Sequence, residues 1–321
     1  MQICSTHSVD LMPKSKEDKT MTTTAAPPPK PPPAAPRTPP PPPPSRPAPP
    51  SAQSSGIIPT FGKAVAAKVA PRLIINAVEG FGKTTIAAHA PNAAILMAKG
   101  ETGYTTLLSK GRVPAIGAAN IEDWGGLNAL LDSWLASDVL PFESLALDAM
   151  GGFERMCHEM VCRRDFKGDW GERGFTSYNK GYDVSIPDWE LMLGRLFDLN
   201  QRGVAIILLS HCKVKNFKNP LGPDFDRWVS NVHEKTWGIT AQWADAVFFG
   251  NFVTVVDEVK STGQKKTGKG VGGSERVIYT ERCDAFDAKN RFGMPPMIEL
   301  LPDPAEMWNT IEYYINKPKE A

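Results

Sequence analysis

A glycine-bearing segment at residues 73–85 has the residue types needed to hold a polyphosphate. An apolar run is followed by a short loop with Gly80 and Gly82, and then by Lys83 and Thr84. Strand, loop and helix start in this order form a P-loop, whose backbone N–H groups and helix N-terminus face the anion. Lys83 would reach the β- and γ-phosphates, and Thr84 would place its hydroxyl on Mg²⁺. The predicted nucleotide-binding residues are Ala77, Val78, Glu79, Gly80, Phe81, Gly82, Lys83, Thr84 and Thr85.

The segment departs from the strict P-loop pattern at one position. That pattern begins with Gly, where this chain has Ala77, and the wider pattern tolerates alanine there. Gly80 and Gly82 allow backbone angles and a close approach that a Cβ would hinder. The alternative is a glycine-rich turn that binds nothing, but the strand and helix expected on either side favour phosphate binding.

Asp148 is the candidate partner of Thr84 at a Mg²⁺ ion. It ends the apolar run that begins at Ser144, at a plausible interval after the P-loop. An acid at the end of a second buried strand orients Mg²⁺ and its waters in P-loop proteins. The pattern is common, and a helix N-cap after a strand remains the alternative.

Two acidic residues are candidates for the base that activates water. Glu101 follows the apolar run that ends at Ala98, and strand ends at the carboxyl edge of an α/β sheet face the ligand crevice. Glu101 is therefore the predicted base, with a solvated loop charge as the alternative. Glu79, inside the P-loop itself, is the rival candidate.

His211 directly follows an apolar run at residues 204–210. A polar residue at this strand end could sense the γ-phosphate and relay its presence to the following segment. A capping or loop-packing histidine is the alternative.

The segment after His211 alternates cations with aromatic residues, and we expect it to be a loop. Lysines can neutralise phosphates and aromatic rings can stack on bases, so it is a candidate single-strand-binding segment. Asp224 and Asp226 dilute the positive charge, and a solvated loop is the alternative. The predicted DNA-binding residues are Lys213, Lys215, Phe217, Lys218 and Trp228.

Lys289 and Arg291 lie on a predicted turn before the last apolar run. In an oligomeric NTPase such cations can reach a neighbour's γ-phosphate, as an arginine finger does. They are therefore predicted catalytic residues, with a solvated turn as the alternative.

Short apolar runs alternate with helical patterns, which predicts βαβ units and a mainly parallel sheet. Strands are expected at Leu73–Ala77, Ala93–Ala98, Ser144–Leu147, Val204–Ser210 and Met297–Leu301. Helices are expected at about Lys83–Ala90, Gly125–Leu135 and Pro187–Arg202, and a hairpin at Ala246–Val256 and Glu275–Glu281. The connection at residues 261–270 is expected to be mobile.

Composition limits the classes of function. The net charge of +1 gives no general pull toward nucleic acid or membrane, and no apolar run is long enough to span a bilayer. The first 20 residues lack the apolar core of a secretory signal, so a cytoplasmic protein is expected. Five scattered cysteines indicate reduced thiols, and Cys157, His158 and Cys162 lack the second half that a metal site would need.

Residues 1–60 are expected to form a disordered tail. Sixteen of the 30 prolines fall between Pro27 and Pro50, which favours polyproline II and little burial. The segment is interpreted as a spacer, and a docking peptide for a protein partner is the alternative. Met21 is an alternative start to Met1.

The order of these motifs resembles that of RecA-core ATPases. Lys83-Thr84, Glu101, Asp148, His211 and Lys289-Asn290-Arg291 occur in that order, and residues 175–182, 233–237 and 244–245 are similar to phage nucleotide-binding proteins of the group. The resemblance covers about residues 70–302, and relatives with only this core include phage single-strand annealing proteins. It implies a RecA-like fold, ATP with Mg²⁺, and recombination or replication as the context.

The sequence therefore predicts a RecA-like α/β P-loop ATPase domain at residues 61–321 behind the proline-rich tail. We expect it to bind ATP and Mg²⁺ and to hydrolyse ATP slowly, as a homo-oligomer on single-stranded DNA. The alternative is a nucleotide-dependent switch or loader that acts through protein partners with little turnover. A nucleotide kinase is disfavoured because no arginine-rich lid is visible.

Overall fold

The computed structural model describes residues 69–257 and 269–317, and side chains only outside residues 254–272. The predicted tail at residues 1–60 and most of the predicted mobile connection at 261–270 lie outside the described residues. Within them, no helix is both long enough and apolar enough to cross a membrane.

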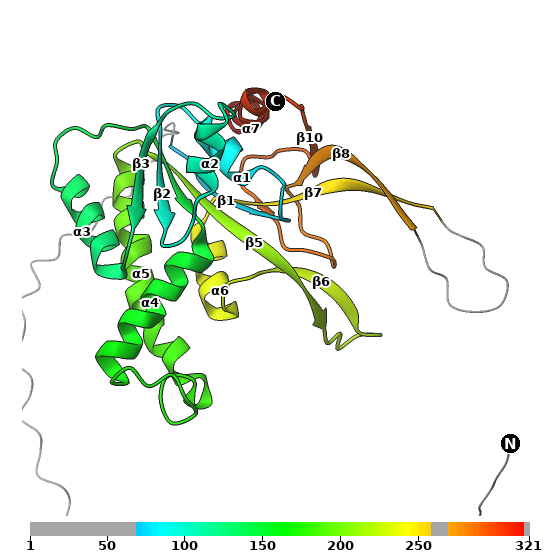
Figure 1. Ribbon diagram of the computed structural model, residues 1–321. Helices are drawn as coiled ribbons and strands as arrows, with labels where there is room; N and C mark the ends of the chain where they lie inside the picture. Colours follow the sequence, from blue (N-terminus) through cyan, green and yellow to red (C-terminus); the bar gives the residue numbers. More distant parts are fainter. Residues whose placement is uncertain (1–68, 258–268, 318–321) are drawn as a thin grey trace, which may run out of the picture. The chain divides into compact units, whose positions relative to one another are not determined.

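The described residues form one ten-stranded sheet, mostly parallel, whose main path runs β10-β8-β7-β1-β5-β4-β2-β3 (Figure 1). The short strand β9 pairs with β7, and β6 pairs with the extension of β5. The strands are β1 (Arg72–Ala77), β2 (Ala93–Ala98), β3 (Gly117–Ile121), β4 (Ser144–Asp148), β5 (Ala205–Phe217), β6 (Phe225–Ser230), β7 (Ala246–Asp257), β8 (Lys269–Tyr279), β9 (Lys289–Asn290) and β10 (Met297–Leu300). The α/β class with a mainly parallel sheet is confirmed.

Burial on both faces explains the central strands. β2 and β4 are buried at every position, and β1 at every position after Arg72. A parallel strand covered by helices on both faces needs a continuous apolar run, which is what these segments contain. The apolar runs were therefore a sufficient signal for the strands that carry the site.

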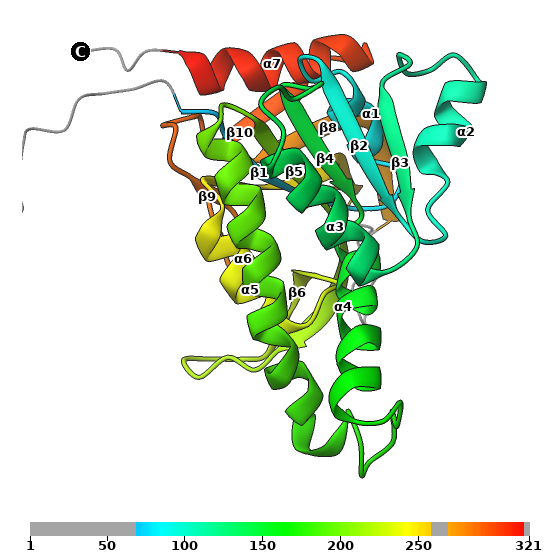
Figure 2. The same cartoon turned by 90° about the vertical axis from the view of Figure 1, so that its left-hand side faces the viewer.

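Helices cover both faces of the sheet (Figures 1 and 2). One apolar cluster joins the sheet to α3, α4 and α5, with α6 packed against it, and a second joins its other face to α1, α2 and α7. The helices are α1 (Lys83–Ala88), α2 (Gly103–Ser109), α3 (Trp124–Leu135), α4 (Met150–Asp165), α5 (Lys180–Gln201), α6 (Glu234–Trp243) and α7 (Pro304–Asn316).

Two expectations about local structure were wrong. The segment at 213–228 is not a loop, because β5 continues to Phe217 and pairs antiparallel with β6 to form a hairpin. Helix α5 begins at Lys180 and runs through Pro187, where the sequence had suggested a helix start. The sequence analysis also left α2, α4, α7, β3 and β9 unassigned.

Candidate functional site

Sheet register brings the predicted site residues to one edge. Ala77, the last residue of β1, lies opposite His211 of β5 on one side and Gly250 of β7 on the other. Asp148 ends β4 beside Met97 of β2, and β2 ends one residue later in the turn that holds Glu101. The carboxyl ends of parallel strands meet at one edge of a sheet. The P-loop, His211, Asp148 and Glu101 therefore share the carboxyl edge.

The P-loop backbone uses the conformational freedom of its glycines. Gly80 has φ of 72° and Gly82 has φ of 102°, both in the left-handed region. Gly82 is the residue immediately before α1, which begins at Lys83. Side chains rarely adopt these angles, so the glycines permit the turn from β1 into α1.

Lys83 is held inside the P-loop. Its side chain is buried, and Nζ donates hydrogen bonds to the carbonyl oxygens of Ala77 and Val78, at 3.0 and 3.2 Å. Burial lowers the pKa of the ammonium, while the charges of Asp148, Glu79 and Glu101 act in the opposite direction. A buried cation surrounded by carbonyl oxygens and acidic groups suits a site that receives a polyphosphate.

Thr84 and Asp148 form the candidate metal site. The Thr84 hydroxyl donates a hydrogen bond to Oδ2 of Asp148 at 2.7 Å. Gly103 lies close to this hydroxyl, since a Cβ added to Gly103 would be 3.5 Å from it. Burial raises the pKa of Asp148, and the Thr84 hydrogen bond lowers it. Two hard oxygen donors fit Mg²⁺, which takes its other ligands from phosphates and water. The described residues contain no group of three His, Cys, Asp or Glu side chains that could hold a metal by itself.

Glu101 lies within electrostatic reach of this pair. It is half-buried, and its pKa is raised by burial and by the charge of Asp148, while Lys83 lowers it. A carboxylate with a raised pKa is better suited to accept a proton near neutral pH. Glu79, the rival candidate, is exposed on the loop. The structure thus places Glu101 within electrostatic range of Asp148 and Lys83, and its role as the base stays a prediction.

His211 contacts the P-loop lysine directly. Its Nδ1 lies 3.4 Å from Nζ of Lys83. Burial lowers the pKa of the imidazole, and the charge of Lys83 lowers it further, while Asp148 and Glu79 act in the opposite direction. The predicted sensing histidine therefore lies within the site, on the strand that continues into the hairpin.

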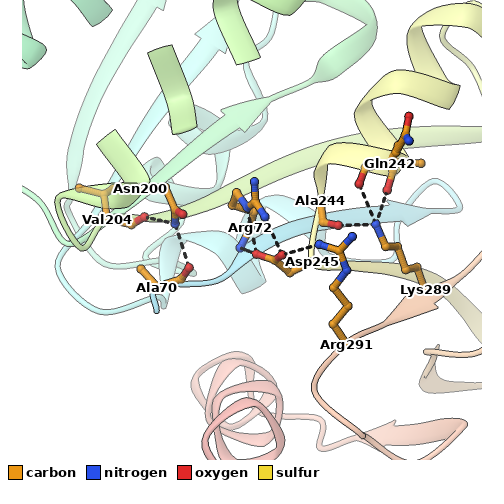
Figure 3. A network of polar contacts seen from close by, with 10 residues as sticks. Ala70, Arg72, Asn200, Val204, Gln242, Ala244, Asp245, Lys289 and Arg291 are labelled. Atoms are coloured by element: carbon orange, nitrogen blue, oxygen red, sulfur yellow. Dashed lines mark hydrogen bonds and ion pairs between the residues drawn. The ribbon is translucent and has the colours of Figure 1, made fainter. Parts of the chain in front are cut away.

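Lys289 and Arg291 belong to a polar network at the end of α6 and the start of β1 (Figure 3). Nζ of Lys289 donates to the carbonyl oxygens of Ala241, Gln242 and Ala244 at 2.9, 2.9 and 2.6 Å, at the end of α6. Arg291 pairs with Asp245 at 3.0 Å, and Asp245 also binds Arg72 at the start of β1. This is the opposite end of β1 from the P-loop. The structure does not bring the two cations to the P-loop, and both have partners within the chain.

The predicted DNA-binding residues divide between the two faces of the β5–β6 hairpin. Lys213, Lys215, Phe217 and Lys218 line a cavity of about 670 Å³ together with Arg227, Trp237 and other residues of β6 and α6. Trp228 points elsewhere: it lies opposite Val214 in the ladder, and its ring lies against Phe249 at 6.0 Å. The structure thus separates Trp228 from the four other residues.

Sequence reasoning missed two cations. Arg227 lines the hairpin cavity with its guanidinium 5.7 Å from the Phe217 ring centroid, and β6 had been assigned to a loop. Arg276 of β8 donates from Nε to the carbonyl oxygen of Phe81 in the P-loop, at 2.7 Å. No local motif surrounds Arg276, so only the tertiary structure could identify it.

A P-loop beside a strand-end carboxylate, on a mainly parallel α/β sheet, defines a nucleotide-binding protein of the P-loop NTPase class. The model of the AAA domain family matches residues 70–292, more than half of the chain. The chain therefore belongs to the AAA domain family.

Solved structures with a related arrangement include the RadB recombinase, at 12% identity and a TM-score of 0.41, covering 74% of this chain and 90% of that one. The flagellar accessory protein FlaH from Methanocaldococcus jannaschii is similar at 10% identity and a TM-score of 0.37, with 72% and 86% covered. No curated protein matches the chain significantly.

Proposed function

We propose that this protein is a Mg²⁺-dependent ATPase that acts on single-stranded DNA in phage-type recombination or replication. The observation that carries the proposal is the hydrogen bond between Thr84 and Asp148 at 2.7 Å, beside the buried Lys83. A bound Mg²⁺–triphosphate requires a hydroxyl, a carboxylate and an ammonium close together, and Thr84, Asp148 and Lys83 supply these groups at the carboxyl edge of the sheet.

Each residue of the cluster has a separate role in this proposal. Lys83 would bind β- and γ-phosphate oxygens in place of its carbonyl partners, and Thr84 and Asp148 would hold a Mg²⁺ ion whose charge offsets that of the phosphates. Glu101 accepts the proton of the attacking water, since its raised pKa and half-buried position suit a general base. His211 contacts the end of the site nearest the hairpin and responds to the γ-phosphate.

The hairpin cavity supports the DNA part of the proposal. Lysines 213, 215 and 218 and Arg227 can neutralise phosphates, and Phe217 offers an exposed ring for stacking. β5 is one continuous strand from the sheet core through His211 to Phe217. Nucleotide and nucleic acid would therefore bind to different parts of the same strand, and the protein would assemble on DNA as a homo-oligomer.

A second candidate is a nucleotide-dependent switch or loader that acts through protein partners. The observation that favours it is that cations lining the cavity have acidic partners. Lys218 pairs with Asp224 at 2.6 Å, Lys215 lies 3.6 Å from Glu234, and Arg227 pairs with Asp287. Mixed charges of this kind also suit a protein surface. The proline-rich tail stays a candidate docking segment for such a partner.

ATP hydrolysis measured with and without single-stranded DNA across a salt series tests the proposal. We expect DNA to stimulate hydrolysis and Lys83→Ala to abolish ATP binding in a folded protein. Lys213→Ala should lower the log–log salt slope of DNA binding by about 0.7, as expected for one lost phosphate contact. Phe217→Ala should weaken binding by roughly 1–3 kcal/mol with little change in slope.

The exposed Lys110, at the end of α2 and away from the hairpin, provides a control of the same charge change. Lys110→Ala should leave the slope unchanged. If the protein binds ATP but no DNA at low salt, the DNA proposal fails and the switch takes its place. If Lys83→Ala binds ATP normally, nucleotide binding at the P-loop is refuted.

A further inference from the structure

The P-loop is held by two strands that lie outside its sequence motif. On β7, the carbonyl oxygen of Gly250 accepts a hydrogen bond from Val78 N at 3.2 Å. The ring of Phe81 is fully buried and packs directly on Gly250, where an added Cβ would come within 2.6 Å of a ring carbon. The middle of the phosphate-binding loop therefore rests on β7.

Arg276 reaches the same loop from β8. It lies opposite Phe252 in the β7–β8 ladder, with its guanidinium 5.4 Å from the Phe252 ring centroid. Phe252 in turn meets the Phe81 ring edge-on, at 6.2 Å between centroids. The Nε of Arg276 donates to the Phe81 carbonyl oxygen at 2.7 Å, a distance typical of a charge-assisted hydrogen bond.

This hydrogen bond fixes more than one atom. In a trans peptide the carbonyl and the next N–H point in opposite directions, so holding the Phe81 oxygen toward Arg276 directs the Gly82 N–H away from it. Gly82 has φ of 102°, and glycine can adopt several other backbone conformations at little cost. A restraint from outside the loop is needed to keep this peptide in one orientation.

We propose that Arg276 is a positioning residue of the nucleotide site, which holds the Phe81–Gly82 peptide in the orientation that binds phosphate before nucleotide arrives. The proposal rests on nucleotide binding at the P-loop, proposed above. It also makes the β7–β8 hairpin a part of the nucleotide site, because cross-strand packing on Phe252 holds the arginine in place.

Nucleotide affinity and hydrogen exchange of the full-length protein test this role. Arg276→Ala should weaken ATP and ADP equally, by about tenfold, because the P-loop grips phosphates that both ligands carry. KM for ATP should rise with kcat nearly unchanged. Amide exchange at residues 79–85 should be faster in the nucleotide-free variant. Arg276→Lys keeps a charged donor and should restore part of the affinity.

Arg282→Ala is the matched control, since Arg282 is exposed just after β8, with Asp287 3.9 Å away as its ion-pair partner. It should change neither affinity nor exchange. Unchanged affinity and exchange in Arg276→Ala would overturn the inference while leaving nucleotide binding intact. A loss confined to ATP would also overturn it, by indicating direct contact with the γ-phosphate.

Two further outcomes have a defined meaning. If Arg276→Ala does not fold, Arg276→Gln keeps a single uncharged donor of similar length and should show the same equal loss, severalfold in size. If the unmodified protein binds neither ATP nor ADP, the proposed function fails and this inference fails with it.

Discussion

Replacing Gly250 by alanine should damage the nucleotide site, although Gly250 is not itself one of the predicted nucleotide-binding residues. The new methyl group would lie 2.6 and 2.7 Å from two ring carbons of Phe81 and 2.8 Å from Cβ of Ala77. Ordinary contact begins at 3.4 Å, so the ring would have to move by 3.4 − 2.6 = 0.8 Å or more. Ala77 and Phe81 both belong to the P-loop, so relief of the clash displaces the loop itself.

Overpacking of this kind costs about 1–3 kcal/mol of unfolding free energy. For a domain of this size, that corresponds to a fall in Tm of roughly 2–12 °C. We also expect weaker ATP binding, because the displaced loop no longer presents its N–H groups in one arrangement. Urea denaturation and calorimetric titration with ATP measure the two effects.

The same substitution at Gly194 gives the opposite expectation. Gly194 lies inside α5, with nothing within 4 Å of its added Cβ. Alanine there should stabilise the protein by about 0.5–1 kcal/mol and leave ATP affinity unchanged. If Gly250→Ala is as stable as the unmodified protein and binds ATP normally, the packing argument for the P-loop is refuted.

Three further predictions concern individual side chains. Glu101→Gln should keep ATP binding but slow single-turnover hydrolysis by about a hundredfold or more. If Glu79→Gln slows hydrolysis and Glu101→Gln does not, Glu79 is the base. Because burial raises the pKa of Glu101, hydrolysis should decline as pH falls through a value above that of an ordinary glutamate, and the Gln variant should lack this decline. Asp148→Asn should shift the Mg²⁺ titration of activity to higher concentration, since it removes the carboxylate paired with Thr84; an unchanged titration would exclude Asp148 as a ligand. Burial lowers the pKa of His158 to about 4, below its value near 6.5 in the unfolded chain. The unfolded chain therefore binds the extra proton first, and the free energy of unfolding should fall by about 2–3 kcal/mol between pH 7 and 4.5. Urea titrations should show that His158→Phe abolishes this loss.

The central strands and most of the nucleotide cluster were predictable because their signals are local. A P-loop is contiguous in the chain, and Asp148, Glu101 and His211 each follow an apolar run that becomes a buried strand or its end. Strand-end position in a parallel sheet then brings them to one edge without further information. That logic required only the strand assignments, which the apolar runs supplied.

The missed features depend on contacts between distant segments. Arg276 reaches a loop 195 residues earlier in the chain, and no pattern around it indicates that contact. The contacts of Lys289 with α6 and of Arg291 with Asp245 are likewise set by tertiary packing, while their predicted reach to a neighbouring subunit's γ-phosphate stays a prediction. The alternation from Lys213 to Phe217 fits an exposed strand as well as a loop, and only pairing with β6 decides between them.

The C-terminal helix has a consequence for where the chain can be cut. The family match ends at residue 292, but α7 places Met307, Trp308 and Ile311 in the same apolar cluster as Ile86 and Ala87 of α1. A protein truncated after residue 292 would lose this cover and expose an apolar patch on α1, the helix that begins with Lys83. Such a patch promotes aggregation. A fragment made for nucleotide studies should therefore retain α7, which ends at Asn316, past the boundary that sequence similarity suggests.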